Sequence, residues 1–361
     1  MQRLVSILIP AYNSERWIGD TMASALRQRW PNKEIIVVDD GSRDGTLAVA
    51  RRFESPAVKV ISQENRGASA ARNLALEHAQ GEYIQWLDAD DLLEPGKIRE
   101  QMKAASSGLT SLTLLSSAFG TFYWRHEKAR FAPDALWRDL SPMEWLLIRF
   151  RENRWLFPAA WLVSRRLAEK AGPWNTELSL DDDGEYFCRA VAASDGVRFV
   201  EGARSYYRQS GYSQLSRSNN DRANESLLRS LSLCVGHLRA LEESERTREA
   251  SLVLLQRLYA YFYYYADSPR FAERTVALAR ELGGELEPPG LERKHEALRR
   301  LLGWKAARKV ISRGQKARFM AKVHWDRLLH NMTRRGAGAA EGGASGDGYI
   351  RDRHHESGAG N

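Results

Sequence analysis

The stretch YIQWLDADD, residues 83–91, joins an apolar run to three carboxylates. Its first five residues have the length and composition of a buried strand. Asp88, Asp90 and Asp91 then place like charges at one point, which is unfavourable unless a cation neutralises them. Taken alone, the cluster is compatible with a divalent metal site and with a solvated acidic turn. The rest of the chain has to distinguish the two.

Upstream of this stretch, short apolar runs alternate with segments of helical pattern. The expected strands are 5–9, 34–38, 58–61 and 83–87, and the expected helices are 15–28, 45–53 and 69–79. Strands that alternate with helices at this spacing indicate crossover connections. The predicted fold class is therefore α/β, with a mostly parallel central sheet flanked by helices.

The carboxyl ends of parallel strands share one edge of the sheet, and ligands bind outside that edge. Four segments should meet there: 10–13, 39–42, 65–72 and 88–91. An acid after the second strand could accept a hydrogen bond from a base or ribose, Arg72 could bind phosphate oxygens, and the last acid cluster could hold a cation. A surface position on a helix is the alternative for Arg72. The set suits a nucleoside diphosphate with a metal ion.

These segments belong to four longer motifs. They are VSILIPAYN (5–13), IVVDDGSRDGT (36–46), NRGASAARN (65–73) and LDADD (87–91). In this order, each after an expected strand, they resemble the signature of family 2 inverting glycosyltransferases, which have the GT-A fold. The resemblance is close over residues 1–110 and looser to about residue 216. It implies a catalytic domain over residues 1–218, with a nucleotide-sugar half (1–110) and an acceptor and base half (111–218).

The resemblance also implies roles for single residues. The donor nucleotide would be bound by Pro10, Ala11, Tyr12, Asn13, Asp40, Asn65, Gly67, Arg72, Asp88 and Ala89. The side chain of Asp40 and the backbone around Ala11 and Tyr12 would hold the nucleobase, whereas Asp39 would be a structural acid. Asp88 would lie near the ribose and the metal, and Asp90 would ligate the metal, Mg²⁺ or Mn²⁺.

Asp91 has two other possible uses. It could bind the metal through water, or it could cap the helix that is expected after Pro95. It therefore ranks below Asp90 as a direct metal ligand.

A second acid cluster, SLDDDGEYFCR at residues 179–189, opens a further expected helix. Acids near a helix N-terminus are ordinary caps, which accounts for one or two of the four acids. The family carries a Glu-Asp pair followed by another acid and an arginine, and alignment on Arg189 places this pair at Asp182 and Asp183. The catalytic base then falls on Asp183, and a one-residue slip would move it to Asp182. An inverting transfer needs such a carboxylate beside the acceptor hydroxyl.

Residues 206–216 resemble a family segment whose histidine can reach the metal or the diphosphate. Ser210 stands at that position here. Either water and phosphate oxygens complete the metal, or Arg208 contacts the diphosphate. A plain surface loop is equally compatible with the sequence.

Aromatic residues between the two acid clusters are candidates for the acceptor side. Trp155 and Trp161 lie in an aromatic-rich run, although most such rings are core residues. Trp174 stands where the family often has an aromatic residue before the base. Between the clusters, Ser141-Pro142-Met143-Glu144 has the pattern of a capping box that starts a helix.

Composition limits the class of protein. A chain of 361 residues with 43% hydrophobic residues is long enough for one sizeable catalytic domain and an additional region. Cys188 and Cys234 form no disulfide framework and no zinc spacing, which favours a reducing, cytoplasmic compartment. We expect no signal peptide, and no apolar run approaches the roughly 20 residues needed to span a bilayer.

Residues 219–335 are expected to form a helical, basic C-terminal region. Its expected helices are 222–245, 247–267, 270–283 and a basic stretch at about 291–335. Much of the net charge of +8 lies in that last stretch, where tryptophans alternate with Lys and Arg. Such a helix can lie peripherally on the anionic inner face of a membrane, with a solvated basic face as the alternative. Nucleic acid is disfavoured because no recognition motif accompanies the charge. Residues 336–361 have the composition of a disordered tail.

The sequence thus predicts a metal-dependent inverting glycosyltransferase. It would move a sugar from a nucleotide diphosphate sugar to a hydroxyl of a glycan or polyprenyl-linked acceptor, as in the synthesis of cell-surface polysaccharides or glycoconjugates. UDP is the favoured donor nucleotide because uridine is the family's commonest base, while guanosine and thymidine stay open. The alternative is a catalytically silent relative that binds nucleotide sugars or glycans as a partner protein. A nucleotidyltransferase is disfavoured because no glycine-rich, lysine-containing phosphate loop follows the first strand.

Overall fold

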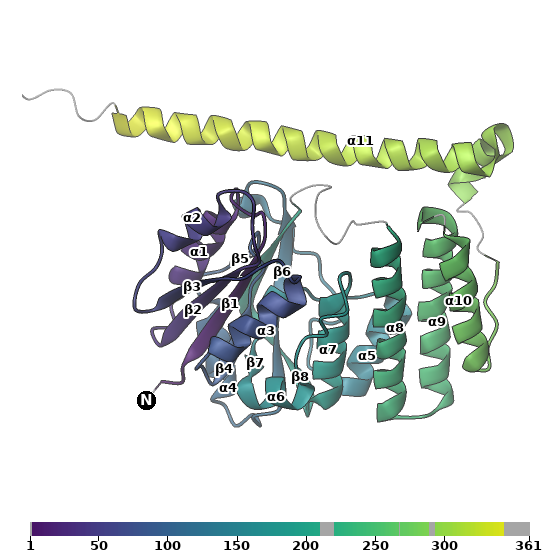
Figure 1. The fold of residues 1–361 in the computed structure, drawn as a ribbon, viewed down its shortest axis with the longest axis horizontal. Helices are drawn as coiled ribbons and strands as arrows, with labels where there is room; N and C mark the ends of the chain where they lie inside the picture. Colours follow the sequence, from purple (N-terminus) through teal and green to yellow (C-terminus); the bar gives the residue numbers. More distant parts are fainter. Residues whose placement is uncertain (1, 210–219, 267, 289–292, 343–361) are drawn as a thin grey trace, which may run out of the picture.

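The structure is a computed structural model that describes residues 2–209, 220–266, 268–288 and 293–342. Its α/β part contains β1 (Val5–Ala11), α1 (Ile18–Leu26), β2 (Lys33–Asp39), α2 (Thr46–Arg51), β3 (Val58–Ser62), α3 (Ala68–His78), β4 (Tyr83–Trp86), β5 (Leu92–Leu93), α4 (Lys97–Ala105), β6 (Thr113–Phe122), η1 (His126–Lys128), α5 (Pro142–Glu152), η2 (Pro158–Ala160), β7 (Val163–Ser164), α6 (Arg165–Ala171), α7 (Asp182–Ala193) and β8 (Gly196–Arg208). The C-terminal part contains α8 (Asp221–Leu241), α9 (Glu245–Tyr261), η4 (Phe262–Ala266), α10 (Pro269–Glu281) and α11 (Arg293–Gly342). Figure 1 shows the two parts side by side, with α11 extending across both.

The central sheet has the strand order β3-β2-β1-β4-β7. β1 pairs in parallel with β2 and with β4, and β2 pairs in parallel with β3, whereas β7 is antiparallel to β4. Every residue of β1 and of β4 is buried, as expected for strands that are covered on both faces. The predicted α/β class and mostly parallel sheet are therefore confirmed.

The expected helices of this half are present with small shifts at their ends. The largest shift is at α1, which begins at Ile18 rather than near residue 15. The backbone first makes a turn in which the carbonyl of Ser14 accepts hydrogen bonds from the N–H groups of Trp17 and Ile18. The expected capping box is also present: the Ser141 hydroxyl accepts from the N–H of Glu144, and the Glu144 side chain accepts from the N–H of Ser141.

A second sheet has the order β5-β8-β6, and its strand β5 directly follows the acidic loop (Asp88–Asp91) after β4. β5 is only two residues long and pairs with β8 through Leu92 opposite Tyr206. β8 ends at Arg208. This pairing brings the end of β8 next to Asp88–Asp91, although more than one hundred residues separate them in the chain.

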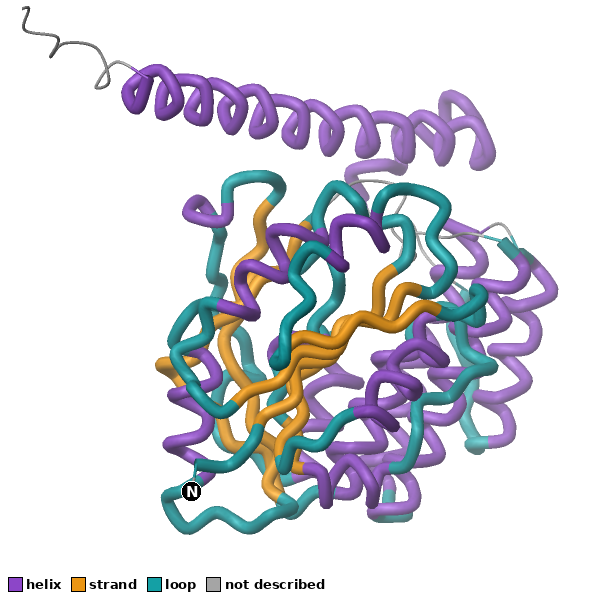
Figure 2. The backbone as a smooth tube through the Cα atoms, turned by 60° about the vertical axis from the view of Figure 1, so that its left-hand side comes forward, coloured by secondary structure: helices purple, strands orange, loops and turns teal. Residues whose placement is uncertain are grey.

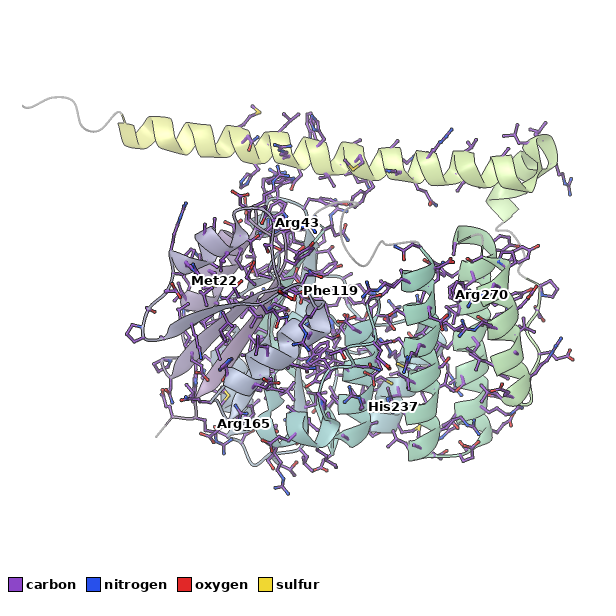
Figure 3. All side chains as sticks on the ribbon, in the orientation of Figure 1. Met22, Arg43, Phe119, Arg165, His237 and Arg270 are labelled. Atoms are coloured by element: carbon purple, nitrogen blue, oxygen red, sulfur yellow. The ribbon has the colours of Figure 1, made fainter. Side chains whose placement is uncertain are left out.

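Figure 3 shows which edge of the central sheet faces α11. Arg43, just after the carboxyl end of β2, lies at the side nearest α11. Arg165 follows the antiparallel strand β7 and lies at the opposite side. Figure 2, in a different orientation, also places α11 beyond the ends of the strands. The carboxyl edge of the sheet, where the sequence predicts ligand binding, therefore faces α11.

The helices α8, α9 and α10 agree in type with the sequence prediction. α8 packs on α7, and α10 packs on α9. Leu228, Leu255, Leu258, Phe262 and Phe271 form a small core between them. In the described part of the chain, no helix has the length and apolarity needed to cross a membrane.

The last helix, α11, is interrupted at Gly303, whose φ of 71° lies in the left-handed region that glycine adopts easily. It ends at Gly342, beyond the predicted start of the disordered tail at Gly336. Ala337, Ala339 and Ala340 are strong helix formers, and a helix that has already formed propagates readily through such residues. Residues 343–361 and the predicted domain boundary at 218–219 lie outside the described residues.

Candidate active site

Arg72 on α3 joins the two acid clusters. Its Nη2 donates to Asp88 Oδ1 at 2.8 Å, and its Nη1 donates to Asp182 Oδ2 at 2.7 Å. Ser69, one turn earlier on α3, donates to the same Asp182 oxygen at 2.9 Å. Burial alone would lower the pKa of Arg72, but Asp182 and Asp88 raise it above its ordinary value, so the guanidinium stays charged. Arg72 is buried, and the alternative of a surface arginine is wrong.

The Trp174 ring packs against the guanidinium group of Arg72. The Arg72 guanidinium carbon lies 4.3 Å from the centroid of the Trp174 ring, a cation–π contact. The other face of the ring stacks on Tyr186 at 4.1 Å. Asn73 fixes the Trp174 backbone by donating to its carbonyl at 2.9 Å and accepting from its N–H at 2.8 Å. Trp174 is almost completely buried, so the prediction of an acceptor contact is corrected to a role in positioning Arg72.

The acidic loop after β4 is held from two sides. Thr21 on α1 donates its hydroxyl to the carbonyls of Ala89 (2.9 Å) and Asp91 (3.0 Å). The Arg208 N–H donates to Asp91 Oδ1 at 2.8 Å. Burial and the neighbouring carboxylates of Asp90 and Asp88 raise the pKa of Asp91 well above its ordinary range. Asp91 makes no side-chain cap on α4, so that prediction is wrong.

Arg208 lies behind the acidic loop and is buried. Its Nε donates to the Asp90 carbonyl at 2.7 Å, and its Nη2 donates to Asp20 at 3.3 Å. The rings of Trp17 and Phe122 lie 4.4 and 4.6 Å from its guanidinium carbon. Because these contacts enclose the guanidinium, the predicted contact with a diphosphate is corrected to support of the acidic loop.

Asp88 and Asp90 are the partly exposed carboxylates of the loop, whereas Asp91 is buried. Within residues 2–209, 220–266, 268–288 and 293–342 no group of three or more His, Cys, Asp or Glu side chains is arranged to hold a metal ion. Mg²⁺ is commonly bound through one or two carboxylates, with water and substrate phosphates as the other ligands. The donor set of Asp88 and Asp90 fits a cation of that kind.

The second and third motifs are joined through Asp40. Its Oδ1 accepts from the side chain of Gln63 at 2.6 Å and from the N–H of Arg66 at 2.9 Å, and its Oδ2 accepts from the N–H of Gly67 at 2.8 Å. The Asn65 side chain donates to the Asp40 carbonyl at 2.9 Å. Gly67 has a φ of 93°, which a residue with a Cβ rarely adopts. Asp40 and Asn65 thus shape the loop, and their predicted contact with the nucleotide stays a prediction.

Asp39 has a feature that the sequence did not reveal. Its Oδ2 accepts from the N–H of Ser42 at 3.2 Å, but its Oδ1 is buried and has no hydrogen-bond partner among the described residues. Buried carboxylate oxygens are normally hydrogen-bonded. This vacant oxygen makes Asp39 a second candidate, beside Asp40, for the predicted contact with the nucleobase, although the sequence indicated a purely structural acid.

The first motif ends beside the second. Pro10 and Ala11 are the buried last residues of β1, and the Ala11 carbonyl accepts from the N–H of Asp40 at 2.8 Å. Asn13 Oδ1 accepts from the N–H of Arg43 at 2.8 Å. The Tyr12 ring is exposed at this edge, as a residue that contacts a ligand could be.

The two candidate bases differ in their surroundings. α7 begins at Asp182, which is buried and bound by Ser69 and Arg72 as described. Asp183 is partly exposed; its Oδ1 accepts from the N–H of Gly184 at 2.9 Å, and no described residue donates to its Oδ2. Desolvation, together with the negative charges of Asp182 and Asp181, raises the pKa of Asp183 to about 7. A carboxylate with this pKa and a vacant oxygen is suited to general-base catalysis.

The profile described as "Glycosyl transferase family 2" matches residues 6–167. Residues 6–167 belong to glycosyltransferase family 2. This family 2 domain is 43% identical over 103 residues to "Putative teichuronic acid biosynthesis glycosyltransferase TuaG" of Bacillus subtilis, a match that covers 28% of this chain and 41% of that protein. It is 39% identical over 100 residues to "UDP-Glc:alpha-D-GlcNAc-diphosphoundecaprenol beta-1,3-glucosyltransferase WfgD" of Escherichia coli, with 27% and 40% covered.

A longer but weaker match is "Glycosyltransferase GlyG" of Streptococcus pneumoniae, which is 27% identical over 223 residues, with 58% of this chain and 73% of that protein covered. The chain thus spans about two fifths of the length of the more similar relatives. Among solved structures, S. aureus TarS 1–349 in complex with UDP-GlcNAc has a TM-score of 0.59 at 20% identity, covering 77% of this chain and 81% of that chain. This likeness confirms the predicted GT-A type of fold.

A cavity lies between the segment at residues 149–181 and the helices α8 and α9. The cavity has a volume of about 290 Å³, and its lining includes Arg149, Trp155 and Asp181. Trp155 is 42% exposed, and its ring contacts Phe119 and Tyr207. Trp161 is fully buried and stacks on Phe187 at 5.1 Å. Trp155 therefore remains an acceptor candidate, and Trp161 is corrected to a core residue.

Sequence reasoning missed the supports of the site. Ser69 and Arg72 are three residues apart on one helix, a spacing that places both on one face and could have linked them. Asp20 and Trp17, which contact Arg208, lie outside the four motifs and carry no comparable signal.

Proposed function

We propose that this protein is an inverting glycosyltransferase that moves a sugar from a nucleoside diphosphate sugar to a hydroxyl group. The observation that carries the proposal is Arg72, which lies 2.8 Å from Asp88 of the acidic loop and 2.7 Å from Asp182 of the second acid cluster. A leaving diphosphate near Asp88 and an acceptor hydroxyl near Asp183 would then lie on either side of one charged side chain. An in-line displacement needs the acceptor oxygen and the leaving diphosphate on opposite sides of the anomeric carbon, so a sugar held between Asp88 and Asp183 would meet that requirement.

In the proposed reaction the Asp183 carboxylate takes the proton of the acceptor hydroxyl. The acceptor oxygen forms its bond to the anomeric carbon while the bond to the diphosphate breaks, and the diphosphate leaves with that electron pair. Asp88 and Asp90 would hold Mg²⁺ or Mn²⁺, which when bound neutralises charge on the leaving diphosphate. Arg72 contributes a fixed positive charge at the same place.

The relatives support one class of substrate. The E. coli relative WfgD is named for a UDP-sugar donor and a diphosphoundecaprenol-linked sugar acceptor. We infer a UDP-sugar donor and a polyprenyl-linked or glycan acceptor, as in the synthesis of cell-surface polysaccharide. Cys188 and Cys234 are buried and free, which agrees with a reaction on the cytoplasmic side, where such donors would be available.

A donor screen tests the proposal and its metal. We expect hydrolysis of a UDP-sugar, in preference to GDP- and dTDP-sugars, with Mg²⁺ or Mn²⁺ and none after chelation. Asp90→Ala should lower turnover by about 10²-fold or more, because the cation would lose a charged ligand. Glu77→Ala, at an exposed acid of α3, is the matched control and should leave turnover unchanged. Donor binding without turnover would favour the silent binding protein, and neither binding nor turnover of any donor would reject the proposal.

The pH dependence follows from Asp183. Its pKa is raised to about 7, and a general base acts only when it is ionised. We therefore expect kcat/KM to rise about tenfold per pH unit below the pKa and to level off above it. Asp182→Asn should move the midpoint to lower pH, because the Asp182 charge helps to raise this pKa. A profile that is flat through neutral pH, or that is not moved by this change, would argue against Asp183 as the base.

A further inference from the structure

The last helix is fastened to the catalytic domain along one stripe. Asp326 of α11 accepts from the backbone N–H groups of Trp124 (2.9 Å) and Arg125 (3.2 Å), and it pairs with the Arg125 guanidinium at 2.6 Å. The rings of Tyr123 and Phe319 lie 5.7 Å apart, and those of Trp124 and His330 lie 5.8 Å apart. Phe319, Asp326 and His330 follow one another at helical spacing, so they define the face of α11 that is turned to the domain.

The opposite face of α11 carries an apolar stripe that no residue of the described part of the chain is seen to cover. Val310, Trp325, Leu328 and Met332 are 49, 64, 44 and 67% exposed. Gly314, Ala317 and Ala321, all exposed, fill the gap between Val310 and Trp325, so that steps of three and four residues run from 310 to 332. This spacing keeps the stripe on one side of a helix. Exposed apolar stripes of this length usually mark a contact surface.

The stripe lies within the most basic part of the chain. α11 contains 14 Lys and Arg and three Asp and Glu, a net charge of +11, whereas the whole chain has +8. The remainder of the protein is therefore slightly acidic. Arg313, Arg318 and Lys322 are exposed beside the stripe, and Asp326, the single acid between residues 297 and 340, is already paired with Arg125.

We propose that this face of α11 binds an anionic lipid surface. Apolar side chains, one of them a tryptophan, would enter the headgroup region while Lys and Arg beside them reach the lipid phosphates. A second copy of the chain is a poorer partner, because paired helices need complementary charges beside the apolar seam and this helix offers only like charges there. Nucleic acid would engage the charges but leave the apolar stripe exposed.

The face of α11 that carries Phe319, Asp326 and His330 connects the proposed lipid-binding face to the catalytic domain. Trp124, which Asp326 and His330 contact, packs against Trp17 at 4.7 Å, and Trp17 lies 4.4 Å from the guanidinium carbon of Arg208. α11 also lies on the side of the molecule toward which the carboxyl ends of the central strands point (Figures 1 and 3). A helix lying on a membrane would hold this edge toward the lipid, and this consequence, unlike the lipid binding itself, rests on the proposed function.

Vesicle co-sedimentation of the full chain tests the proposal. We expect binding to phosphatidylcholine vesicles that contain phosphatidylglycerol, weakening as salt rises, and much weaker binding to pure phosphatidylcholine. Trp325→Glu with Met332→Glu should abolish the binding. Arg318→Glu with Lys322→Glu should weaken it at least about tenfold, because each basic residue near an anionic surface contributes to the affinity.

Matched controls separate the stripe from general effects of charge. Leu241→Glu with Val253→Glu changes two exposed aliphatic side chains on α8 and α9, and Arg51→Glu with Lys170→Glu reverses two exposed charges on α2 and α6. Both control pairs should bind vesicles like the unchanged protein, and circular dichroism should show that all variants are folded. Equal loss in the control pairs, unchanged binding of the stripe pair, or a dimer that Trp325→Glu dissociates without lipid would overturn the proposal.

Discussion

Replacing Asp183 by Asn should leave donor binding unchanged and lower sugar transfer by about 10²- to 10⁴-fold, the usual contribution of a general base. Asn has nearly the same shape as Asp but cannot take the hydroxyl proton. Asp183 Oδ1 accepts only the N–H of Gly184 among the described residues, so an amide oxygen can keep that hydrogen bond. Donor affinity by calorimetry and transfer rate with a saturating acceptor are the two measurements.

The same variant should be more stable than the unchanged protein at high pH. The pKa of Asp183 is raised from 3.8 to about 7, so the ionised carboxylate is disfavoured in the folded state, and stability is lost as the pH rises through this range. Partial exposure screens the neighbouring charges, and we expect a gain of about 1–2 kcal/mol above pH 7 that disappears near pH 4. A residue with a purely structural role would lose activity and stability together.

Asp182→Asn is the comparison for the position of the base. Asp182 Oδ2 is occupied by Ser69 and Arg72, so Asp182 is poorly placed to receive a proton from an acceptor. If Asp182→Asn lowered transfer as much as we expect of Asp183→Asn, while Asp183→Asn had little effect, the one-residue slip considered for the alignment would be right.

The order of strands and helices could be predicted because the apolar runs of β1 and β4 are buried throughout and the helices between the strands have a different, helical pattern. Parallel strands share a carboxyl edge, and that alone brings Asp88 near Arg72 before any side chain is placed. The base cluster was recognised by its resemblance to the family, and its distance from Arg72 was not predictable. The hydrogen bond from Arg72 to Asp182 depends on how α7 packs against α3.

The misassigned residues share a physical cause. Arg208, Trp161 and Trp174 are large side chains whose type suits both a ligand site and a packed interior. Which of the two they serve depends on neighbours from distant segments, such as Asn73 beside Trp174 and Asp20 beside Arg208. Asp39 and Asp40 are a similar case, because Asp39 ends β2, Asp40 follows it, and only the surrounding loop determines which carboxylate is fully hydrogen-bonded.

Replacing Arg72 by Met should destabilise the protein by about 3–5 kcal/mol, because removal of one partner leaves buried charges without compensation. Arg72 is the cation between Asp88 and Asp182, and the side chains of Arg72, Asp88 and Asp182 are 6, 28 and 10% exposed. Asp88 stays partly solvated, so the loss of its charged partner should contribute less to the destabilisation than the loss at Asp182. Chemical denaturation monitored by far-UV circular dichroism measures the change, and Arg66→Met, at an exposed arginine of the same motif, is the control.

A double variant shows whether charge is the cause. In Arg72→Met, the further change Asp182→Asn removes one of the uncompensated carboxylates, so we expect it to recover about half of the lost stability, whereas in the unchanged protein Asp182→Asn should be destabilising. The stability of Arg72→Lys should lie between those of the unchanged protein and of Arg72→Met. A single ammonium group keeps the charge but cannot donate to both carboxylates with the geometry of a guanidinium. If the two single changes were simply additive, Arg72 would act through packing on Trp174 and not through the carboxylates that it joins.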